Sequence, residues 1–276
     1  MRKKNYISRV LIAILLLALA LTYLYPLFFM GINSIKSQSQ YMESPFRVIL
    51  SGAKYENYTQ IFYNFKLGRY LLNTLWVTVL KLLITIPLAL FASYAFAKLR
   101  FRGKNAVYPA VIAVMFIPFQ VIMIPLYVML TKVHLVNTYT GYVVVAVTLG
   151  LPAMIMLLTS FMHSVPNEML EAAKIDGCGY FRTVFRIVAP MSRPVLSINL
   201  IISFISSWND VLIPMVIIKD STKQLVMPAL NNLVGQFSKD IPMQLAGILI
   251  ATIPAILIYV FLQKQIIMGI TDGSAK

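Results

Sequence analysis

The chain is built around long apolar stretches, and their lengths predict helices that cross a membrane. A helix needs about 20 residues to span the hydrocarbon core of a bilayer. The stretches run continuously and lack the alternation of apolar and polar residues that marks transmembrane strands. We therefore predict an all-α integral membrane protein with six transmembrane helices. They lie within Arg9–Lys36, Arg69–Lys98, Lys104–Lys132, Tyr139–Phe161, Pro190–Ile217 and Asp240–Lys264.

The composition supports this class. Of the 276 residues, 59% are hydrophobic and 12% are charged. Soluble globular proteins contain roughly 45–50% apolar and about 25% charged residues, so this chain has too little polar surface for a soluble fold. The single cysteine, Cys178, excludes an intrachain disulfide and a zinc site built from several cysteines.

The distribution of charge predicts the orientation of the helices. Lys and Arg total 24 against 9 Asp and Glu, a net charge of +15. The basic residues gather in the N-terminus and in the connections 98–104 and 164–194, whereas the third-to-fourth connection has only Lys132 and His134. The positive-inside rule then places both termini in the cytoplasm. Because topology explains much of the positive charge, we expect no nucleic-acid partner.

The first apolar stretch has a second interpretation as a signal peptide, because Ala18-Leu19-Ala20 resembles a cleavage site. Its apolar run continues to Met30, which is longer than a normal signal-peptide core and favours a transmembrane helix. The predicted parts are a cytoplasmic N-terminus with the first helix (1–36), an extracytoplasmic segment (37–69), a core transmembrane domain (70–268) with a cytoplasmic segment (164–190), and a cytoplasmic tail (269–276).

The connection between the fourth and fifth spans is polar enough to fold outside the membrane. We predict a helix over Asn167–Ile175, with Ser164 as its N-cap. Gly177 and Gly179 end this helix, because glycine accepts the left-handed conformation found at helix ends. A second helix is predicted over Tyr180–Val188. The segment is therefore a helix–turn–helix on the cytoplasmic surface.

The first of these two helices has the features of a docking element. Ala172 and Ala173 form a small apolar patch, Met169 adds flexible apolar surface, and Glu171 can pair with Lys174. A short helix of this kind suits a groove in a partner protein. The residue types also allow a membrane-surface helix with no protein partner.

The same residues resemble a known family motif. Glu171-Ala172-Ala173, then Gly177, Ile187 and Pro190, match the EAA motif of the permeases of binding-protein-dependent ABC importers in every spacing. Ala189 departs from the leucine that the family usually has there, which is a small apolar change.

Other segments resemble the carbohydrate-uptake permeases of the MalG type, and this likeness covers essentially the whole chain. They are Asp176-Gly177, Trp208-Asn209, Ile117-Pro118 and the ending Gly269–Lys276. The resemblance implies a subunit of a type I ABC importer in a bacterial cytoplasmic (inner) membrane, surrounded by membrane lipid. Its implied partners are a MalF-like second permease, a dimer of ABC ATPase subunits and an extracytoplasmic solute-binding protein.

The ATPase itself is not encoded in this chain. A P-loop needs the pattern G-x-x-x-x-G-K-[ST], and the Gly103-Lys104 pair is followed by Asn105 and fails the match. We therefore expect a transport subunit that is not an enzyme and holds no cofactor, with ATP and magnesium bound by the partner ATPase. The residues predicted to dock and couple to that ATPase are Glu168, Glu171, Ala172, Ala173, Lys174, Asp176 and Gly177.

A second candidate site lies in the fifth span. Asp210 is an acid at membrane depth, which is costly and therefore a functional candidate. Together with Trp208 and Asn209 it can line a polar path for a sugar; alternatively, it lies near the outer end or pairs with a neighbouring helix. The expected cargo is a sugar or oligosaccharide. The alternatives are a permease for another small solute and a stand-alone secondary transporter, which would need a complete path in one chain.

Overall fold

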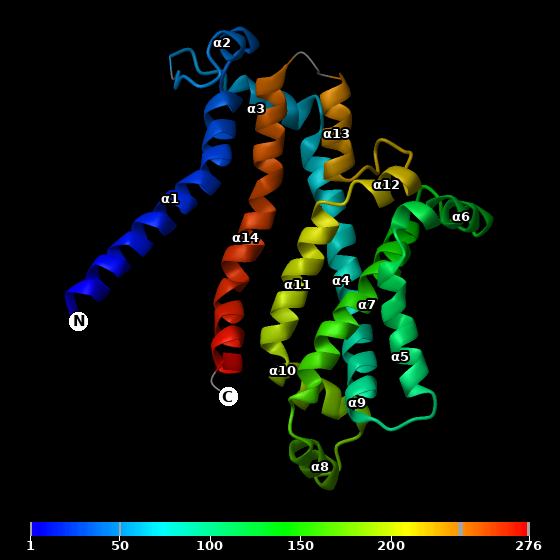
Figure 1. Cartoon of the computed structure of the whole chain (residues 1–276). Helices are drawn as coiled ribbons and strands as arrows, with labels where there is room; N and C mark the ends of the chain where they lie inside the picture. The colour runs from blue at the N-terminus through cyan, green and yellow to red at the C-terminus, as the bar shows by residue number, and fades with distance from the viewer. Residues whose placement is uncertain (1, 50, 237–239, 275–276) are drawn as a thin grey trace. The chain divides into compact units, whose positions relative to one another are not determined.

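A computed structural model describes residues 2–49, 51–236 and 240–274, and the regular structure in these ranges is helical (Figure 1). The chain packs as two compact units. Unit 1 consists of Met1–Gly68 and Leu230–Ile253, and unit 2 consists of Arg69–Ala229 and Pro254–Lys276. The unit boundaries fall inside three helices, so each unit is described by its own contacts.

Unit 1 contains the first three helices and parts of three others, of which α4 (Leu67–Lys98) contributes only Leu67 and Gly68. The bounds are α1 (Arg2–Ser34), α2 (Gln38–Glu43) and α3 (Glu56–Tyr63), with most of α13 (Val226–Gln236) and the first part of α14 (Ile241–Ser274).

A buried lysine organises the turn that follows α1. Lys36 is 1% exposed and donates hydrogen bonds to the carbonyl oxygens of Ser44 (2.9 Å) and Pro45 (3.2 Å). The amide of Asn57 in α3 donates to the carbonyl oxygens of Ser34 (2.8 Å) and Lys36 (3.0 Å). Burial lowers the pKa of Lys36. These bonds hold α3 and the loop after α2 against the end of α1.

Unit 2 contains the remaining helices. The bounds are α4 (Leu67–Lys98, of which Arg69 onward belongs here), α5 (Lys104–Ala113), η1 (Val114–Phe116), α6 (Phe119–Lys132), α7 (Tyr139–His163), α8 (Asn167–Ile175), α9 (Tyr180–Thr183), η2 (Val184–Val188), α10 (Ala189–Met191), α11 (Arg193–Trp208), α12 (Leu212–Ile217) and the later part of α14.

The core of unit 2 forms along α7. One end of α7 packs a buried cluster around Tyr142 with Val77 of α4 and Ile217 of α12. Further along α7, Leu158 packs with Ala89 of α4 in a second cluster. The helix buries residues around its circumference, as expected when the lipid covers little of its surface.

Four helical segments are long and apolar enough to cross a membrane by themselves: Ser8–Ser34, Leu67–Lys98, Tyr139–His163 and Ile241–Lys264. Two of the predicted spans are instead bent. The helices Lys104–Phe116 and Phe119–Lys132 meet at 100°, and Tyr180–Met191 and Arg193–Trp208 meet at 82°. The helix count by length is therefore four, or up to six if each bent pair is one span.

The bend within Lys104–Lys132 has a physical cause in the sequence. Pro118 adopts an extended conformation (φ −60°, ψ 133°) as the N-cap of α6 and has no backbone N–H to continue the preceding helix. The predicted span Pro190–Ile217 is also interrupted further along, because α11 ends at Trp208 and α12 begins at Leu212. Asp210 lies in that break rather than inside a helix.

Candidate coupling surface and polar cluster

The helix predicted over Asn167–Ile175 has these bounds in the structure, as α8. Figure 1 shows α8 beyond the ends of α7 and α9. The predicted N-cap was wrong. Pro166 occupies the N-cap without a side-chain hydrogen bond, and the Ser164 hydroxyl instead donates to the carbonyl oxygen of Phe161 (2.7 Å) at the end of α7. Ser164 lies too early because it is the C-cap of α7, and Val165 and the extended Pro166 separate it from the first residue of α8.

The end of α8 depends on one glycine. Gly177 has φ +72°, its N–H donates to the Lys174 carbonyl oxygen (3.1 Å), and the N–H of Cys178 donates to that of Ala173 (2.9 Å). This pair of bonds is a Schellman motif, in which the left-handed residue is usually glycine. A Cβ at Gly177 would meet nothing within 4 Å, so the constraint is backbone conformation and not space.

One of the seven predicted docking residues is buried, and the other six are exposed. Ala173 is buried, with 4% of its surface exposed. The other six are exposed: Glu168, Glu171, Ala172, Lys174, Asp176 and Gly177.

Sequence reasoning missed two exposed apolar side chains in the connection that contains α8. Ile175, at the last position of α8, is 86% exposed, and Phe181 in α9 is 69% exposed. Large apolar residues in an otherwise polar connection are the signal that could have identified them. Met169 of α8 is 45% exposed, so this helix presents two apolar side chains in addition to its exposed charged residues.

Aromatic rings fasten the segment after α8 to α4. Tyr180 lies against Tyr94 with ring centroids 5.2 Å apart, and its hydroxyl donates to the Phe91 carbonyl oxygen (3.3 Å). Phe91 also contacts the rings of Phe181 (5.2 Å) and Phe185 (5.3 Å) edge-on. Edge-to-face contacts of this kind are the favoured geometry for aromatic pairs.

The three residues predicted to line a path differ in their surroundings. Trp208 is 2% exposed, and its ring stacks on Phe204 (5.4 Å, 12°). Asn209 is exposed and Asp210 is half-buried. Asp210 accepts hydrogen bonds from the hydroxyl of Tyr142 (3.3 Å) and the N–H of Ile213 (3.2 Å).

A buried lysine completes this polar cluster. The ammonium of Lys81 in α4 donates to the hydroxyl of Ser207 (2.7 Å) and the carbonyl oxygen of Ser203 (3.4 Å), both in α11. Its positive charge also acts on Asp210. The polar cluster, defined as Lys81, Tyr142, Ser207 and Asp210, therefore joins α4, α7 and the end of α11.

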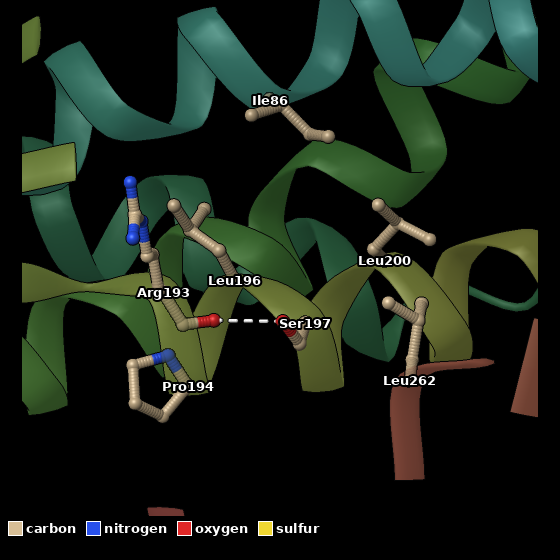
Figure 2. A pocket seen from close by; sticks show the side chains of 7 residues that line it. All are labelled: Ile86, Arg193, Pro194, Leu196, Ser197, Leu200 and Leu262. Carbon is tan, nitrogen blue, oxygen red and sulfur yellow. Dashed lines mark hydrogen bonds between the residues drawn. The ribbon is translucent and has the colours of Figure 1, made fainter. Parts of the chain in front are cut away.

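A cavity of about 530 Å³ lies elsewhere in unit 2, between α4, α11 and α14. Figure 2 shows Arg193, Leu196 and Leu200 along α11, with Ile86 facing them from α4. The Ser197 hydroxyl donates to the Arg193 carbonyl oxygen (2.8 Å). The walls are mainly apolar, which does not suit the many hydroxyl groups of a sugar. The full lining is Ile86, Arg193, Pro194, Leu196, Ser197, Leu200 and Leu262.

Comparison with known proteins identifies the family. The family described as the binding-protein-dependent transport system inner membrane component matches residues 85–268. The chain belongs to this family. As a binding-protein-dependent permease it is a multi-pass membrane component of an ABC importer, and its role is transport.

Three relatives show how far the similarity to this permease extends. The melibiose/raffinose/stachyose import permease protein MelC of Bacillus subtilis is 27% identical over 277 residues, covering 100% of both chains. The arabinooligosaccharides permease protein AraQ of the same organism is 26% identical and covers 98% of this chain and 96% of its own. The multiple sugar-binding permease protein MsmG of Streptococcus mutans is 33% identical and covers 76% of each.

Solved structures share the permease fold. A chain of a bacterial ABC transporter involved in the import of the acidic polysaccharide alginate superposes with a TM-score of 0.78 at 21% identity. The match covers 95% of this chain and 97% of that one. A chain of the alginate transporter in complex with a pentasaccharide-bound periplasmic protein gives a TM-score of 0.68 at 15% identity, covering 94% and 93%.

Proposed function

We propose that this permease is a MalG-like subunit of an ATP-driven ABC importer that carries a sugar or oligosaccharide. The observation that carries the proposal is similarity along the whole chain to permeases named for sugars, of which MelC matches over 100% of both lengths. We infer that the chain forms half of the translocation path and pairs with a MalF-like second permease, and that an extracytoplasmic binding protein delivers the solute.

We propose six transmembrane spans, with each bent helix pair counted as one span. This reading gives the even number of crossings that places both termini on one side. The basic residues of the N-terminus and of the connections 98–104 and 164–194 favour the cytoplasm for that side. The tail at 269–276 is then cytoplasmic; α14 runs to Ser274, and residues 275–276 lie outside the described part of the chain.

We propose that α8 docks into a groove of the ABC ATPase dimer and couples its motion to the permease. The exposed carboxylates of Glu168 and Glu171 and the apolar side chains of Met169 and Ile175 offer the mixed surface that such a groove recognises. Closure of the ATPase dimer on ATP would then move α8 as a rigid body and expose a central cavity first to one side and then to the other. Ala173 would contribute through packing and not through contact with the ATPase, because its small buried side chain lets α8 lie close to the bundle.

For the translocation path we propose Asn209 and Asp210, with Trp208 behind them. Asn209 is exposed in the break between α11 and α12, and a carboxylate with hydrogen-bonding capacity lies next to it. Amide and carboxylate groups are the usual partners of sugar hydroxyls, since both exchange hydrogen bonds with them. The indole of Trp208 supports this turn by stacking on Phe204.

Purification of the tagged chain from its native membrane in mild detergent tests the proposal. We expect an ABC ATPase and a second permease to co-purify, and the neighbouring binding protein to bind sugars. Reconstituted vesicles should then accumulate the bound sugar only with ATP. A chain that purifies alone across several detergents and transports solute without ATP would be a stand-alone carrier. An importer that takes up only amino acids, peptides or metals would contradict the sugar assignment.

A further inference from the structure

Lys98, the last residue of α4, fastens the beginning of α8. Its ammonium donates to the carbonyl oxygen of Val165 (2.6 Å) and to the side-chain oxygen of Asn167 (2.9 Å). Val165 is buried, and Asn167 is the first residue of α8. The carboxylate of Glu168, one residue further on, adds an attractive charge. Hydrogen bonds from a charged donor are stronger than neutral ones, so this is a specific attachment.

The other end of the same loop is attached to the same helix. Tyr180 follows α8 and is held by the ring of Tyr94 and the carbonyl oxygen of Phe91, both in α4. Between these two attachments, Leu170 of α8 packs against a buried cluster that includes Leu90 and Tyr94. The entry, the body and the exit of the α8 loop therefore all contact the stretch of α4 from Leu90 to Lys98, roughly its last two and a half turns.

The far part of α4 reaches the polar cluster in the bundle. Lys81 lies on the same continuous 32-residue helix and bonds Ser207 at the end of α11. At about 1.5 Å per residue, Lys81 and Lys98 are about 25 Å apart along the axis. A helix is stiff along its length, so a displacement at one end is carried to the other. Pro87 lies between the two lysines without ending the helix.

We propose that Lys98 is a positioning residue that clamps α8 to α4, and that α4 is the lever that transmits motion from α8 to the break between α11 and α12. This inference rests on the proposed function, because it takes α8 as the docking element. Without the clamp, α8 still presents its docking surface and Leu170 and Tyr180 still contact α4, but the entry of the loop is free to shift, so less of the movement of α8 reaches the bundle.

The chain offers a matched control for this clamp. Lys104 lies in the basic connection after α4 and donates to the Leu99 carbonyl oxygen (3.3 Å), so its hydrogen bond stays within its own connection. Lys98→Met and Lys104→Met remove the same charge from the same region, and only the first removes bonds to α8. Lys98→Arg keeps a charged donor, and Asn167→Ala removes one of the two acceptors without touching the lysine.

The test uses the complete importer, reconstituted in vesicles with its ATPase, second permease and binding protein. Solute transported per ATP hydrolysed and the amount of ATPase retained are measured together. We expect Lys98→Met to retain the ATPase and continue to hydrolyse ATP, while transport per ATP falls about tenfold, since a charged hydrogen-bond network is lost. Lys98→Arg should recover most of the ratio, Asn167→Ala should lose less, and Lys104→Met should match the wild type.

The outcomes separate the inference from the proposed function. A wild-type chain that retains no ATPase would overturn both. If the wild type couples normally and Lys98→Met has the same transport per ATP, the clamp is refuted and the docking assignment stands. Loss of ATPase binding by a folded Lys98→Met chain would make Lys98 a docking residue and would also refute the lever. Should Lys98→Met fail to accumulate in the membrane, Asn167→Ala decides: an unchanged ratio overturns the clamp.

Discussion

The α8 surface and the polar cluster contain similar residue types but use them in opposite ways. On α8, Glu171, Lys174 and Asp176 are exposed, with Ile175 beside them at 86% exposure. In the polar cluster, Lys81 bonds Ser207, and Tyr142 bonds Asp210, inside the bundle. The first region leaves its polar groups available, whereas the second pairs its polar groups inside the bundle and leaves only Asp210 half-buried at its edge, next to the exposed Asn209.

This difference separates binding from support. Removing one of two groups that are partners in a low-dielectric interior leaves the other unpaired at a high cost. Exposed groups contribute little to stability and much to recognition. Substitutions in the polar cluster should therefore act first on stability, and substitutions on α8 should act on coupling. Four predictions, from the largest effect to the smallest, test this contrast.

The largest effect is expected from the neighbours Trp208 and Asn209. Trp208→Ala removes a buried ring that stacks on Phe204 and should lower the free energy of unfolding by on the order of 3 kcal/mol. Asn209→Ala affects an exposed side chain and should leave stability within about 0.5 kcal/mol while raising the KM for the sugar. Denaturant unfolding in detergent and uptake kinetics measure the two quantities. Equal destabilisation by both changes would contradict this contrast and show that Asn209 contributes as much to packing as Trp208.

The next effect concerns the charges of the polar cluster. Lys81→Met should cost on the order of 1–3 kcal/mol, because it leaves the buried hydroxyl of Ser207 without its charged hydrogen-bond donor. Asp210→Asn should be milder, since the amide can still accept from Tyr142. If the two charges compensate each other, the double variant should be less destabilised than the sum of the single changes, which a double-mutant cycle detects. Strict additivity would argue that the two residues act independently.

A smaller effect on the fold, but a large effect on transport, is expected at Gly177. Gly177→Val forces a β-branched residue into φ +72°, at a local cost of about 1–2 kcal/mol, and should fray the end of α8. Gly179→Val is the matched control, because Gly179 has φ −69° and a Cβ there meets nothing within 4 Å. We expect a loss of ATP-coupled uptake of about tenfold for the first variant only, with both chains present in the membrane. Equal uptake by the two variants would contradict a coupling role for this turn.

The smallest effect on stability is expected at Ile175. Ile175→Ser exchanges a side chain that is 86% exposed, so thermal unfolding should be unchanged within about 0.5 kcal/mol. The affinity of the variant permease for the ATPase should nevertheless fall several-fold, because a few side chains that become buried on binding carry most of the binding energy of an interface. Titration of the detergent-solubilised permease with ATPase measures this affinity. An unchanged affinity would move the docking surface away from the end of α8.

The sequence predicted the local elements best. The bounds of α8 follow from local chemistry, since Pro166 precedes it and Gly177 ends it in the required left-handed conformation. Four of the predicted spans are matched by unbroken apolar helices. The angle of 100° between the two helices on either side of Pro118 was not predicted. The length of an apolar stretch does not distinguish one straight helix from two shorter helices that meet at an angle.

Contacts between distant residues could not be predicted in the same way. Lys81 and Ser207 belong to different helices, and nothing in the periodicity of either segment pairs them. Lys98 was interpreted only as one of several basic residues that set topology, and its bonds to Val165 and Asn167 depend on how α4 ends beside α8. Such attachments arise from tertiary packing, which a single sequence does not specify.

Photo-crosslinking from position 175 in native membranes tests whether α8 docks on the ABC ATPase. A photoreactive amino acid in place of Ile175 extends from the most exposed apolar site on α8. If α8 docks on the ATPase, we expect an adduct whose mass spectrum identifies an ABC ATPase, with a yield that changes when ATP is trapped in the complex. The same probe in place of Val144, an exposed residue of α7, should give no ATPase adduct. Adducts of position 175 with lipid alone would contradict docking on the ATPase and make α8 a membrane-surface helix.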